Sequence, residues 1–391
     1  MLLKIFLKSK YNYIKNSIPI IDLWLITELL PALLLFIIGF IIFSMSLGTL
    51  LYLIQQLFLT SLSLTGLLQI IIYELPGYIA ISIPMSCLLT HLTIFSRLRE
   101  KNELLALKAL GVSTRRILVP VLFIGIISSI ITFSLTNLVA PAANRASDLT
   151  LRSELGVTND INMSNQIQYS NFIPDKDNKN SRLIHLFYAE IFENNQMNGV
   201  TLIDYTNKNY TKLISAKKAY LDDKKNQWVF LDGTIVMQAI DKSSEMIKES
   251  FIEYSLNPGV LGEGPIKMAN IPKDSNNMSL FESFKSEKLY REAGNIKELR
   301  KIKVRIQEKF TFPLTCVIFS FTGAIIGSIK TRNLNQSQAF GISIMIIIIY
   351  YTLAFIFSSL GVSGVLNPMV SAWSPVFFVS FIGDFYLKKI E

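Results

Sequence analysis

Long apolar blocks alternate with short polar connectors along most of this chain. Residues 29–54 (LLPALLLFIIGFIIFSMSLGTLLYLI) contain no charged side chain, and Glu28 lies just outside them. A helix rises about 1.5 Å per residue, and about 20 apolar residues cross the hydrocarbon core of a bilayer. The block therefore predicts a membrane-spanning helix. Five further spans are predicted at about 67–95, 117–139, 311–329, 338–360 and 365–387.

A polar segment separates the third predicted span from the fourth, and its pattern is that of β structure. Turn clusters, among them Asn194-Asn195 and Asp232-Gly233, separate or interrupt stretches rich in β-forming residues. This pattern predicts an antiparallel β domain, either a sandwich or a jelly roll. His185 lies on one of these stretches, and we interpret it as a structural residue. The predicted strands cover residues 182–192, 199–206, 211–221, 227–238 and 249–256.

The segments around these strands complete the predicted organisation. Residues 173–181 are expected to form an exposed loop, residues 259–280 a linker, and residues 281–309 a helical lead-in to span four. The predicted fold is a polytopic α-helical membrane protein with six transmembrane helices and an exported β-jelly-roll-like domain between helices three and four. The predicted domains are an N-terminal membrane half (1–139), the exported domain (140–280), and a linker helix with the C-terminal membrane half (281–391).

The net charge of +9 gathers at the ends of the apolar spans. Because Lys and Arg mark the cytoplasmic side of membrane proteins, both termini and the loops at 96–117 and 330–337 are predicted to be cytoplasmic. This topology exports the β domain and accounts for the charge without a nucleic-acid partner. The residues that set it are Lys4, Lys8, Lys10, Lys15, Arg97, Arg99, Lys101, Lys108, Arg115, Arg116, Lys330, Arg332, Lys388 and Lys389.

No motif in the chain indicates catalysis. There is no Walker A sequence, and Cys87 and Cys316 fall within apolar spans, which disfavours a disulfide framework or a metal site. With only His91 and His185, histidine-based catalysis has few candidates. We therefore expect a protein that is not an enzyme, with no catalytic residue, metal or cofactor of its own.

Some features of the spans have both a functional and a structural interpretation. Glu74 in span two is either a functional intramembrane carboxylate or a residue near the exported interface. Pro76 and Pro84 either kink the same helix at a gate or are simply tolerated, as prolines are in membrane helices. The small residues of GAIIGS at 323–328 predict a close approach of two helices.

The basic loop at 96–117 (SRLREKNELLALKALGVSTRRI) predicts a short helix at about 98–111. Gly111 is expected to end this helix, and Ser113 or Thr114 to cap the next one. Four residues fall at i, i+3, i+4 and i+7 and so form one stripe headed by a carboxylate. Either a partner protein covers this stripe, or it packs on the membrane surface or on its own bundle. The stripe consists of Glu103, Ala106, Leu107 and Leu110.

The block NELLALKALGVSTRRI at 102–117 resembles the coupling helix of LptF/LptG-type permeases. These are the membrane subunits of the ABC system that extracts lipopolysaccharide and moves it to the outer membrane. The resemblance covers nearly the whole chain, including DLWLITELLPALL at 22–34 and FPLTCVIFSFTGAIIGSIKTR at 312–332. The sequence around residues 103–114 looks most like that of cyanobacterial or plastid members.

The resemblance implies an ATP-driven mechanism in which a separate chain hydrolyses ATP. A second permease chain, the same or a sister, would face this one across a lipid cavity. A cytoplasmic ABC ATPase dimer would bind ATP and Mg²⁺, and a periplasmic bridge protein would join the β domain. Glu103 matches the family's glutamate that contacts the ATPase. The coupling residues that accompany it are Arg99, Ala106, Leu107, Leu110 and Gly111.

Two departures from the family pattern concern the substrate. Members that handle lipopolysaccharide often carry basic residues in span one, but residues 29–60 contain no Lys or Arg. Val376 stands where the family pattern has asparagine. The expected substrate is a lipid, either lipopolysaccharide or a related glycolipid, and the missing charges favour a lipid with fewer phosphates. The basic lead-in to span four is either a solvated helix face or a contact for lipid headgroups. Its candidate contact residues are Arg300, Lys301 and Arg305.

The expected location is the inner (cytoplasmic) membrane, with a plastid membrane as the alternative. Two other classes of function stay open on the sequence. An ion-coupled secondary transporter would use ionisable groups near mid-bilayer, of which the chain offers almost none. A membrane scaffold that anchors the exported β domain would enclose no lipid cavity.

Overall fold

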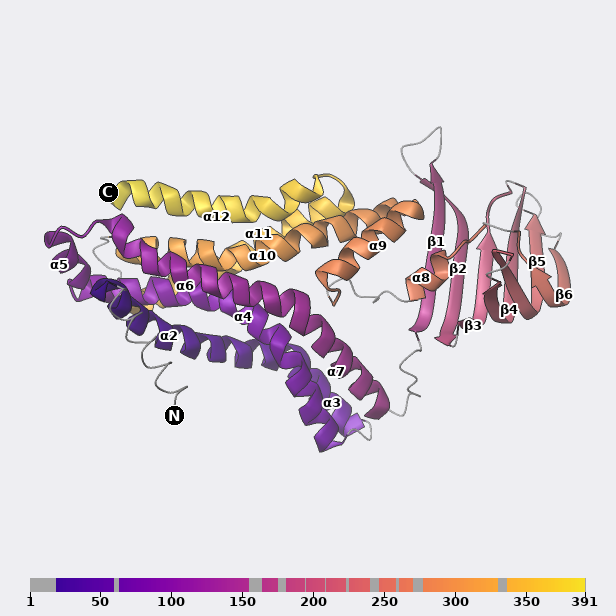
Figure 1. Ribbon diagram of the computed structural model, residues 1–391, viewed down its shortest axis with the longest axis horizontal. Helices are drawn as coiled ribbons and strands as arrows, with labels where there is room; N and C mark the ends of the chain where they lie inside the picture. The colour runs from indigo at the N-terminus through magenta and orange to yellow at the C-terminus, as the bar shows by residue number, and fades with distance from the viewer. Residues whose placement is uncertain are drawn as a thin grey trace, which may run out of the picture. The chain divides into compact units, whose positions relative to one another are not determined.

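Two compact units make up the computed structural model of the chain (Figure 1). The helical unit comprises Met1–Ser147 and Gln307–Glu391, and the β unit is Asp148–Ile306. The basic residues at 4–15 and 330–332 and most of the predicted loop at 173–181 lie outside the described residues. The structure describes residues 19–59, 63–154, 164–174, 181–193, 195–207, 209–222, 225–239, 246–257, 260–269, 277–329 and 336–390.

Six helices among the described residues are long and apolar enough to cross a membrane, which confirms the six predicted spans. Spans one and three each contain a short π-helical segment, labelled η. The first three spans are α2 (Ile20–Met45) with η1 (Ser46–Leu50) and α3 (Leu51–Leu59), α4 (Leu64–Glu100), and α6 (Thr114–Ser134) with η2 (Leu135–Val139) and α7 (Ala140–Glu154). The last three are α10 (Ile296–Ser328), α11 (Gln336–Ser363) and α12 (Pro368–Ile390).

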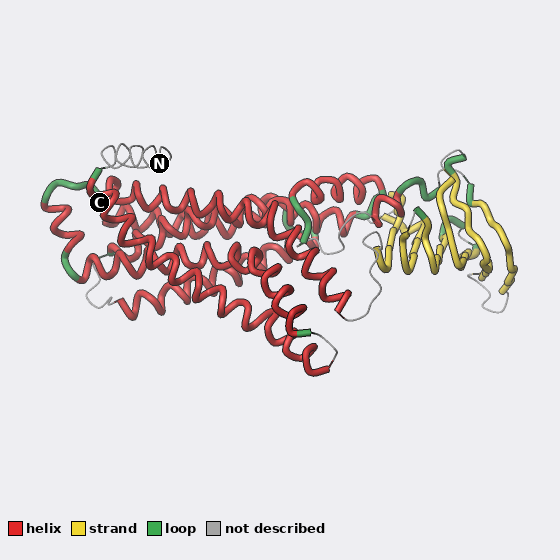
Figure 2. The backbone as a smooth tube through the Cα atoms, turned by 60° about the horizontal axis from the view of Figure 1, so that its bottom comes forward, coloured by secondary structure: helices red, strands yellow, loops and turns green. Residues whose placement is uncertain are grey.

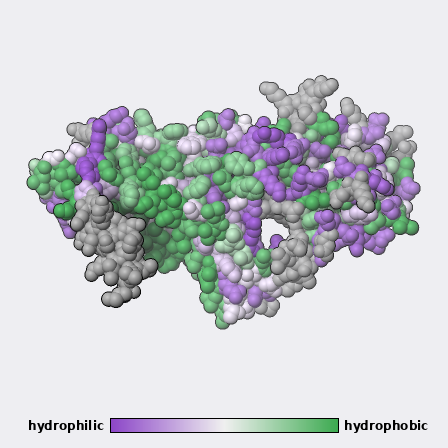
Figure 3. Space-filling model, viewed as in Figure 1, coloured by the Kyte–Doolittle hydropathy of each residue, from purple (hydrophilic) through white to green (hydrophobic). Residues whose placement is uncertain are grey.

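The first span illustrates how these helices place their apolar side chains. Leu25, Leu29 and Leu33 of α2 are buried, and their spacing of four residues puts them on one ridge against the bundle. Several other apolar side chains of this helix pack partly against the bundle, and the rest face outward, where hydrocarbon would surround them. Figure 3 shows the hydrophobic surface of the helical unit. The large exposed ones are Ile20, Leu30, Leu34, Leu35, Ile38, Ile42 and Phe43.

Glycines allow α10 to approach its neighbours closely. A Cβ added at Gly323 would lie 2.8 Å from the Leu88 carbonyl oxygen of α4, and one added at Gly327 would lie 2.7 Å from that of Leu92. Carbon and oxygen atoms do not approach so closely, so only glycine permits this backbone contact. The close approach predicted for the GAIIGS segment is therefore confirmed.

The β unit contains one antiparallel sheet, which confirms the predicted antiparallel β domain between spans three and four. Its strand order follows the sequence, so among the described strands it is a meander without the crossovers of a jelly roll. Short turns explain this order, because two residues separate the paired ends Glu193 and Gln196. The strands are β1 (Ser164–Pro174), β2 (Ser181–Glu193), β3 (Gln196–Asp204), β4 (Tyr210–Asp222), β5 (Gln227–Ala239) and β6 (Met246–Ser255).

One face of this curved sheet carries the core of the β unit, and the short helix α8 (Gly264–Ala269) packs against it (Figure 2). Asn195 adopts a left-handed backbone with φ 64° in the turn between β2 and β3. Asp232, with φ 50°, interrupts β5 without ending it. The fully buried aromatic side chains of the core include Phe187 and Phe230.

The predicted helical lead-in to span four is confirmed, but it is a hairpin of two helices. The helix α9 (Leu280–Glu292) ends at a turn, and α10 then begins at Ile296. Gly294 occupies this turn with φ 67°. A Cβ at Gly294 would lie 2.5 Å from the Phe172 carbonyl oxygen of β1, so both the backbone angle and the space require glycine there.

Replacing Gly323 with alanine is expected to destabilise the helical unit, because overpacking of this kind costs about 1–3 kcal/mol. The measurement is the thermal midpoint for loss of monodisperse protein in detergent. Gly341→Ala in α11 is the matched control, because nothing lies within 4 Å of a Cβ there. Both substitutions gain helix propensity, so their difference isolates packing. Equal midpoints for the two variants would contradict the prediction.

Candidate functional site

A seven-residue helix, α5 (Glu103–Ala109), lies at the turn between α4 and α6 at one end of the helical bundle (Figure 1). The sequence predicted one helix at about 98–111, but the chain breaks earlier. Helix α4 continues to Glu100, and Asn102 then adopts a left-handed backbone with φ 61°. Arg99 therefore belongs to the end of α4, whereas Glu103 is the first residue of α5.

Both ends of the loop after α5 are fixed as predicted. Gly111 has φ 85°, and the Val112 amide donates to the Leu107 carbonyl oxygen at 3.1 Å. This pattern is a Schellman motif, which satisfies carbonyl groups at the end of the helix. The Arg116 amide donates to Ser113 Oγ at 3.3 Å, so Ser113, rather than Thr114, caps α6.

The apolar residues of α5 divide between the bundle and the solvent. Leu104 is buried in the core of the helical unit, and Leu107 packs partly against that core. Ala106 is exposed, and Leu105 and Leu110 are 61% and 81% exposed. The predicted stripe is thus split: Leu107 packs on the bundle, whereas Ala106 and Leu110 face outward. Sequence reasoning missed Leu104 and Leu105, because spacing alone does not show which stripe faces the bundle.

Glu103 is partly exposed and makes no hydrogen bond or ion pair with any residue that the structure describes. Arg99, in contrast, donates to the carbonyl oxygen of Ile329 at the end of α10. The two candidate coupling residues therefore have different roles in the structure, since Arg99 contacts the bundle and Glu103 is open to solvent.

Two arginines tie the ends of this loop to α2. Arg116 and Asp22 form a two-pronged ion pair, with Nη1 to Oδ1 at 2.7 Å and Nη2 to Oδ2 at 2.8 Å. Arg97 of α4 pairs with Glu28 of α2. Because a two-pronged fork restricts both partners, the Arg116–Asp22 contact fixes a direction as well as a distance. The sequence identified these arginines as topology signals, but it did not identify their partners.

A small pocket lies under α5. Its volume is about 30 Å³, which is too small for a lipid chain or a nucleotide. This pocket therefore marks the seat of α5 on the bundle and not a substrate site. It is lined by Phe95, Leu104, Lys108, Thr114, Ile117, Leu118, Ile325 and Ser328.

Glu74 joins three spans of the helical unit. Thr49 of the π-helical segment η1 donates a hydrogen bond to one Glu74 carboxylate oxygen, and Ser147 Oγ donates to the other at 3.2 Å. The Tyr78 hydroxyl accepts the Thr49 amide at 3.1 Å. Spans one and three change direction after η1 and η2 (Figure 1). Glu74 therefore holds three spans together near the point where two of them bend. Short π-helical segments such as η1 and η2 are frequent at functional sites.

Comparison with known families decides the identity of this fold. The sequence model of the lipopolysaccharide export system permease LptF/LptG matches residues 24–389. The chain belongs to this family. A comparison with curated proteins gives no match. The family and the six spans together identify a multi-pass inner-membrane permease of a lipopolysaccharide export system.

The membrane core of this permease accommodates its departures from the family pattern. Val376 is buried in the main core of the helical unit, where an apolar side chain needs no hydrogen-bond partner. Asp22 and Glu28 are the charged residues of α2, and each is paired with an arginine of another helix. Span one therefore presents no cation to a phosphate along residues 29–59.

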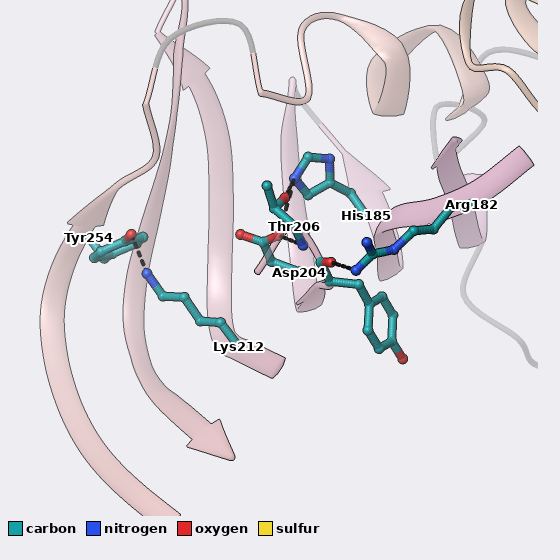
Figure 4. Close-up of polar contacts among 7 residues, drawn as sticks. Arg182, His185, Asp204, Thr206, Lys212 and Tyr254 are labelled. Carbon is teal, nitrogen blue, oxygen red and sulfur yellow. Dashed lines mark hydrogen bonds and ion pairs between the residues drawn. The ribbon is translucent and has the colours of Figure 1, made fainter. Parts of the chain in front are cut away.

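His185 has a structural role in the β unit, as its strand position predicts (Figure 4). Its Nε2 atom lies 3.2 Å from Thr206 Oγ1 and 3.4 Å from Asp204 Oδ1. The Thr206 amide donates to Asp204 Oδ1 at 2.8 Å, and Arg182 Nη2 donates to the Tyr205 carbonyl oxygen at 3.0 Å. These contacts fasten the end of β3 to β2.

The β unit is expected to lose stability as the pH falls below about 6.5, the ordinary pKa of histidine. Burial lowers the pKa of His185, and the Asp204 carboxylate opposes this only in part. The unfolded chain therefore binds the proton first on acidification, and stability that is complete above that pH declines. Amide exchange of β2 and β3 in the full chain, corrected for intrinsic rates, should accelerate by up to about tenfold per pH unit.

The His185→Gln variant is the control for this measurement. Glutamine retains a polar side chain of similar reach but does not titrate. Its β2 and β3 amides should show a weaker acceleration over the same pH range. If the wild-type and variant chains respond to pH alike, another group accounts for the pH dependence.

Proposed function

We propose that this permease is the membrane-spanning subunit of an ATP-driven exporter and takes its energy from a separate cytoplasmic ATPase dimer that binds ATP and Mg²⁺. The observation that carries the proposal is the outward face of α5. This face presents Glu103, which has no partner in the described structure, beside the exposed Leu110. Such a face on a short loop fits a groove with an apolar floor and a basic residue at its rim.

The attachments of α5 explain how a push from the ATPase would reach the spans. Leu104 seats α5 in the core, and the Arg97–Glu28 and Arg116–Asp22 pairs fasten the flanking helices to α2. A displacement of α5 would therefore move α2, α4 and α6 together. Arg99 would extend this motion to α10 through its contact with Ile329.

The proposed substrate is a lipid or lipopolysaccharide-related glycolipid, taken from the membrane for transport toward the outer membrane. The exposed apolar side chains of α2 between Leu30 and Phe43 suit acyl chains. The cations at the start of α10 suit headgroup phosphates. Arg300 is exposed there, Lys301 lies 3.6 Å from Glu298, and Arg305 is partly buried. Few phosphates are expected on the substrate because span one offers no cation.

The proposed assembly contains a second permease chain, the same or a sister, and a periplasmic bridge protein. Helices α2 and α11 bury few of their residues inside the bundle, so either could face lipid or the second chain. In the sheet, β1 and β6 are the edge strands, and an edge strand can accept a strand from another protein. Both termini and α5 would then lie in the cytoplasm and the β unit on the other side.

Replacing Glu103 with lysine is expected to reduce co-purification of the ATPase about tenfold, which corresponds to about 1.4 kcal/mol. The physical reason is that a like charge would meet the basic rim of the groove. Lipid release from vesicles that contain the whole complex should fall in parallel. Leu110→Ser should also weaken the complex, because it removes an exposed apolar contact.

Lys101→Glu is the control of opposite sign, because Lys101 is exposed two residues before Glu103 but outside α5. It should retain the ATPase. Normal co-purification and normal lipid transport by Glu103→Lys would exclude the proposed docking site. Lipids that co-purify with the complex, identified by mass spectrometry, would name the substrate class.

A further inference from the structure

The helix α9 buries two serines and exposes two phenylalanines, the reverse of what is usual for these residue types. Ser283 and Ser286 are completely buried, whereas Phe281 is 80% exposed and Phe284 is 49% exposed. The serines tolerate burial because their hydroxyls donate to carbonyl oxygens one turn earlier, at Ser279 and Glu282, each at 2.8 Å. No described residue of the β unit covers the outward phenylalanines, so we ask which medium outside suits them.

Lysines share the outward face with these phenylalanines. Phe281, Phe284, Lys285 and Lys288 fall at i, i+3, i+4 and i+7, and all four are exposed. Lys285 makes no hydrogen bond or ion pair with a described residue, and Lys288 Nζ lies 4.0 Å from Glu292. A stripe of aromatic and cationic residues matches the interface of a bilayer, where acyl chains lie beneath anionic phosphates. We call these four residues the α9 stripe.

The hairpin with α10 brings the stripe toward the membrane. Met278 and Leu289 form a buried cluster with Ile302 and Ile306 of α10, so the two helices run antiparallel from the turn at Gly294 (Figure 1). The first turn of α9 therefore lies beside the part of α10 around Ile306. A capping box between Ser279 and Glu282 fixes this first turn.

Helix α10 is unbroken from Ile306 into span four, which is predicted to begin at about residue 311. Five residues of helix correspond to about 8 Å, and each headgroup layer of a bilayer is about 5–8 Å thick. Within the helical unit, Trp373 Nε1 donates to Gln307 Oε1 at 3.1 Å, and tryptophan is typical of this interfacial depth. The length of α10 thus predicts headgroup level for its residues around Ile306.

We propose that α9 is an interfacial anchor, with Phe281 and Phe284 inserted in the outer leaflet and Lys285 and Lys288 at phospholipid phosphates. The stripe would hold α9 at the bilayer surface. This anchor does not depend on the proposed ATPase coupling, because it concerns only the resting chain in its membrane.

Spin labels on the full chain in lipid nanodiscs containing phosphatidylglycerol test this anchor. Labels are placed at Phe281→Cys and Phe284→Cys, with Ile252→Cys as the control. Ile252 is 83% exposed on β6, whereas Cys87 and Cys316 are fully buried and should not react. The ratio of collisions with oxygen to collisions with a nickel chelate should be several-fold higher at 281 and 284 than at 252. Oxygen concentrates in the acyl region, and the chelate stays in water.

Equal ratios at the three positions would overturn the proposal, because the phenylalanines would then face water. Loss of access to both reagents at 281 and 284 would also overturn it and would indicate a protein partner. The Lys285→Glu/Lys288→Glu variant, labelled at 281, should show a ratio reduced toward that of residue 252. An unchanged ratio would overturn the role of the lysines. Transport is not a readout, so a failure of ATPase coupling would leave this result intact.

Discussion

Backbone contact between helices in the bilayer is the constraint on which the helical unit depends. Lipid is as apolar as leucine, so helices in a membrane gain little from burying apolar side chains and associate through close packing. Helix α10 does this on three sides. Gly323 and Gly327 admit α4, a Cβ at Gly125 of α6 would lie 3.0 Å from Val317, and one at Gly383 of α12 would lie 3.1 Å from the Phe321 ring. Because these contacts leave no slack, α10 cannot shift without displacing α4, α6 and α12.

Polar contacts then determine which parts of this tightly packed bundle can move together. Exposed ion pairs contribute little stability, so the value of the Arg116–Asp22 fork lies in its geometry. It joins the start of α6 to the start of α2, while Glu74 joins spans one, two and three where η1 and η2 interrupt regular helix. The first three spans are thus connected both near the start of α2 and near η1 and η2. A block connected in this way transmits a displacement along its length instead of absorbing it.

Elements with a strong local signal were predictable from the sequence, whereas their partners were not. Apolar length fixed the six spans, and small residues fixed the close approach at Gly323 and Gly327. The end of α5 at Gly111 and the cap at Ser113 were also predictable, because both depend on local backbone chemistry. The break at Asn102 was not, since asparagine only tolerates a left-handed backbone and tertiary contacts decide whether it adopts one.

The residues that α5 buries and the strand order of the β unit could not be predicted from the sequence, for a related reason. Leu104 and Leu107 are similar side chains on neighbouring faces, and only the position of the bundle decides that Leu104 is the more deeply buried. Alternating β-forming residues indicate which segments are strands, but a meander and a jelly roll share that alternation. The role of Glu103 stays a prediction, because an exposed carboxylate without a partner records only where a partner can bind.

The charges beside exposed apolar residues distinguish two proposed environments in this protein, a protein groove at α5 and a bilayer surface at α9. The outward side of α5 combines Leu105 and Leu110 with Glu103 and Lys108, so it carries both signs. The α9 stripe combines its phenylalanines with Lys285 and Lys288, and the Glu292 carboxylate one turn further along lies 4.0 Å from Lys288. Phospholipid surfaces are anionic and repel carboxylates, whereas a protein groove can complement either sign. The same apolar exposure therefore supports both proposals, a protein partner at α5 and a bilayer at α9, because the charges beside it differ.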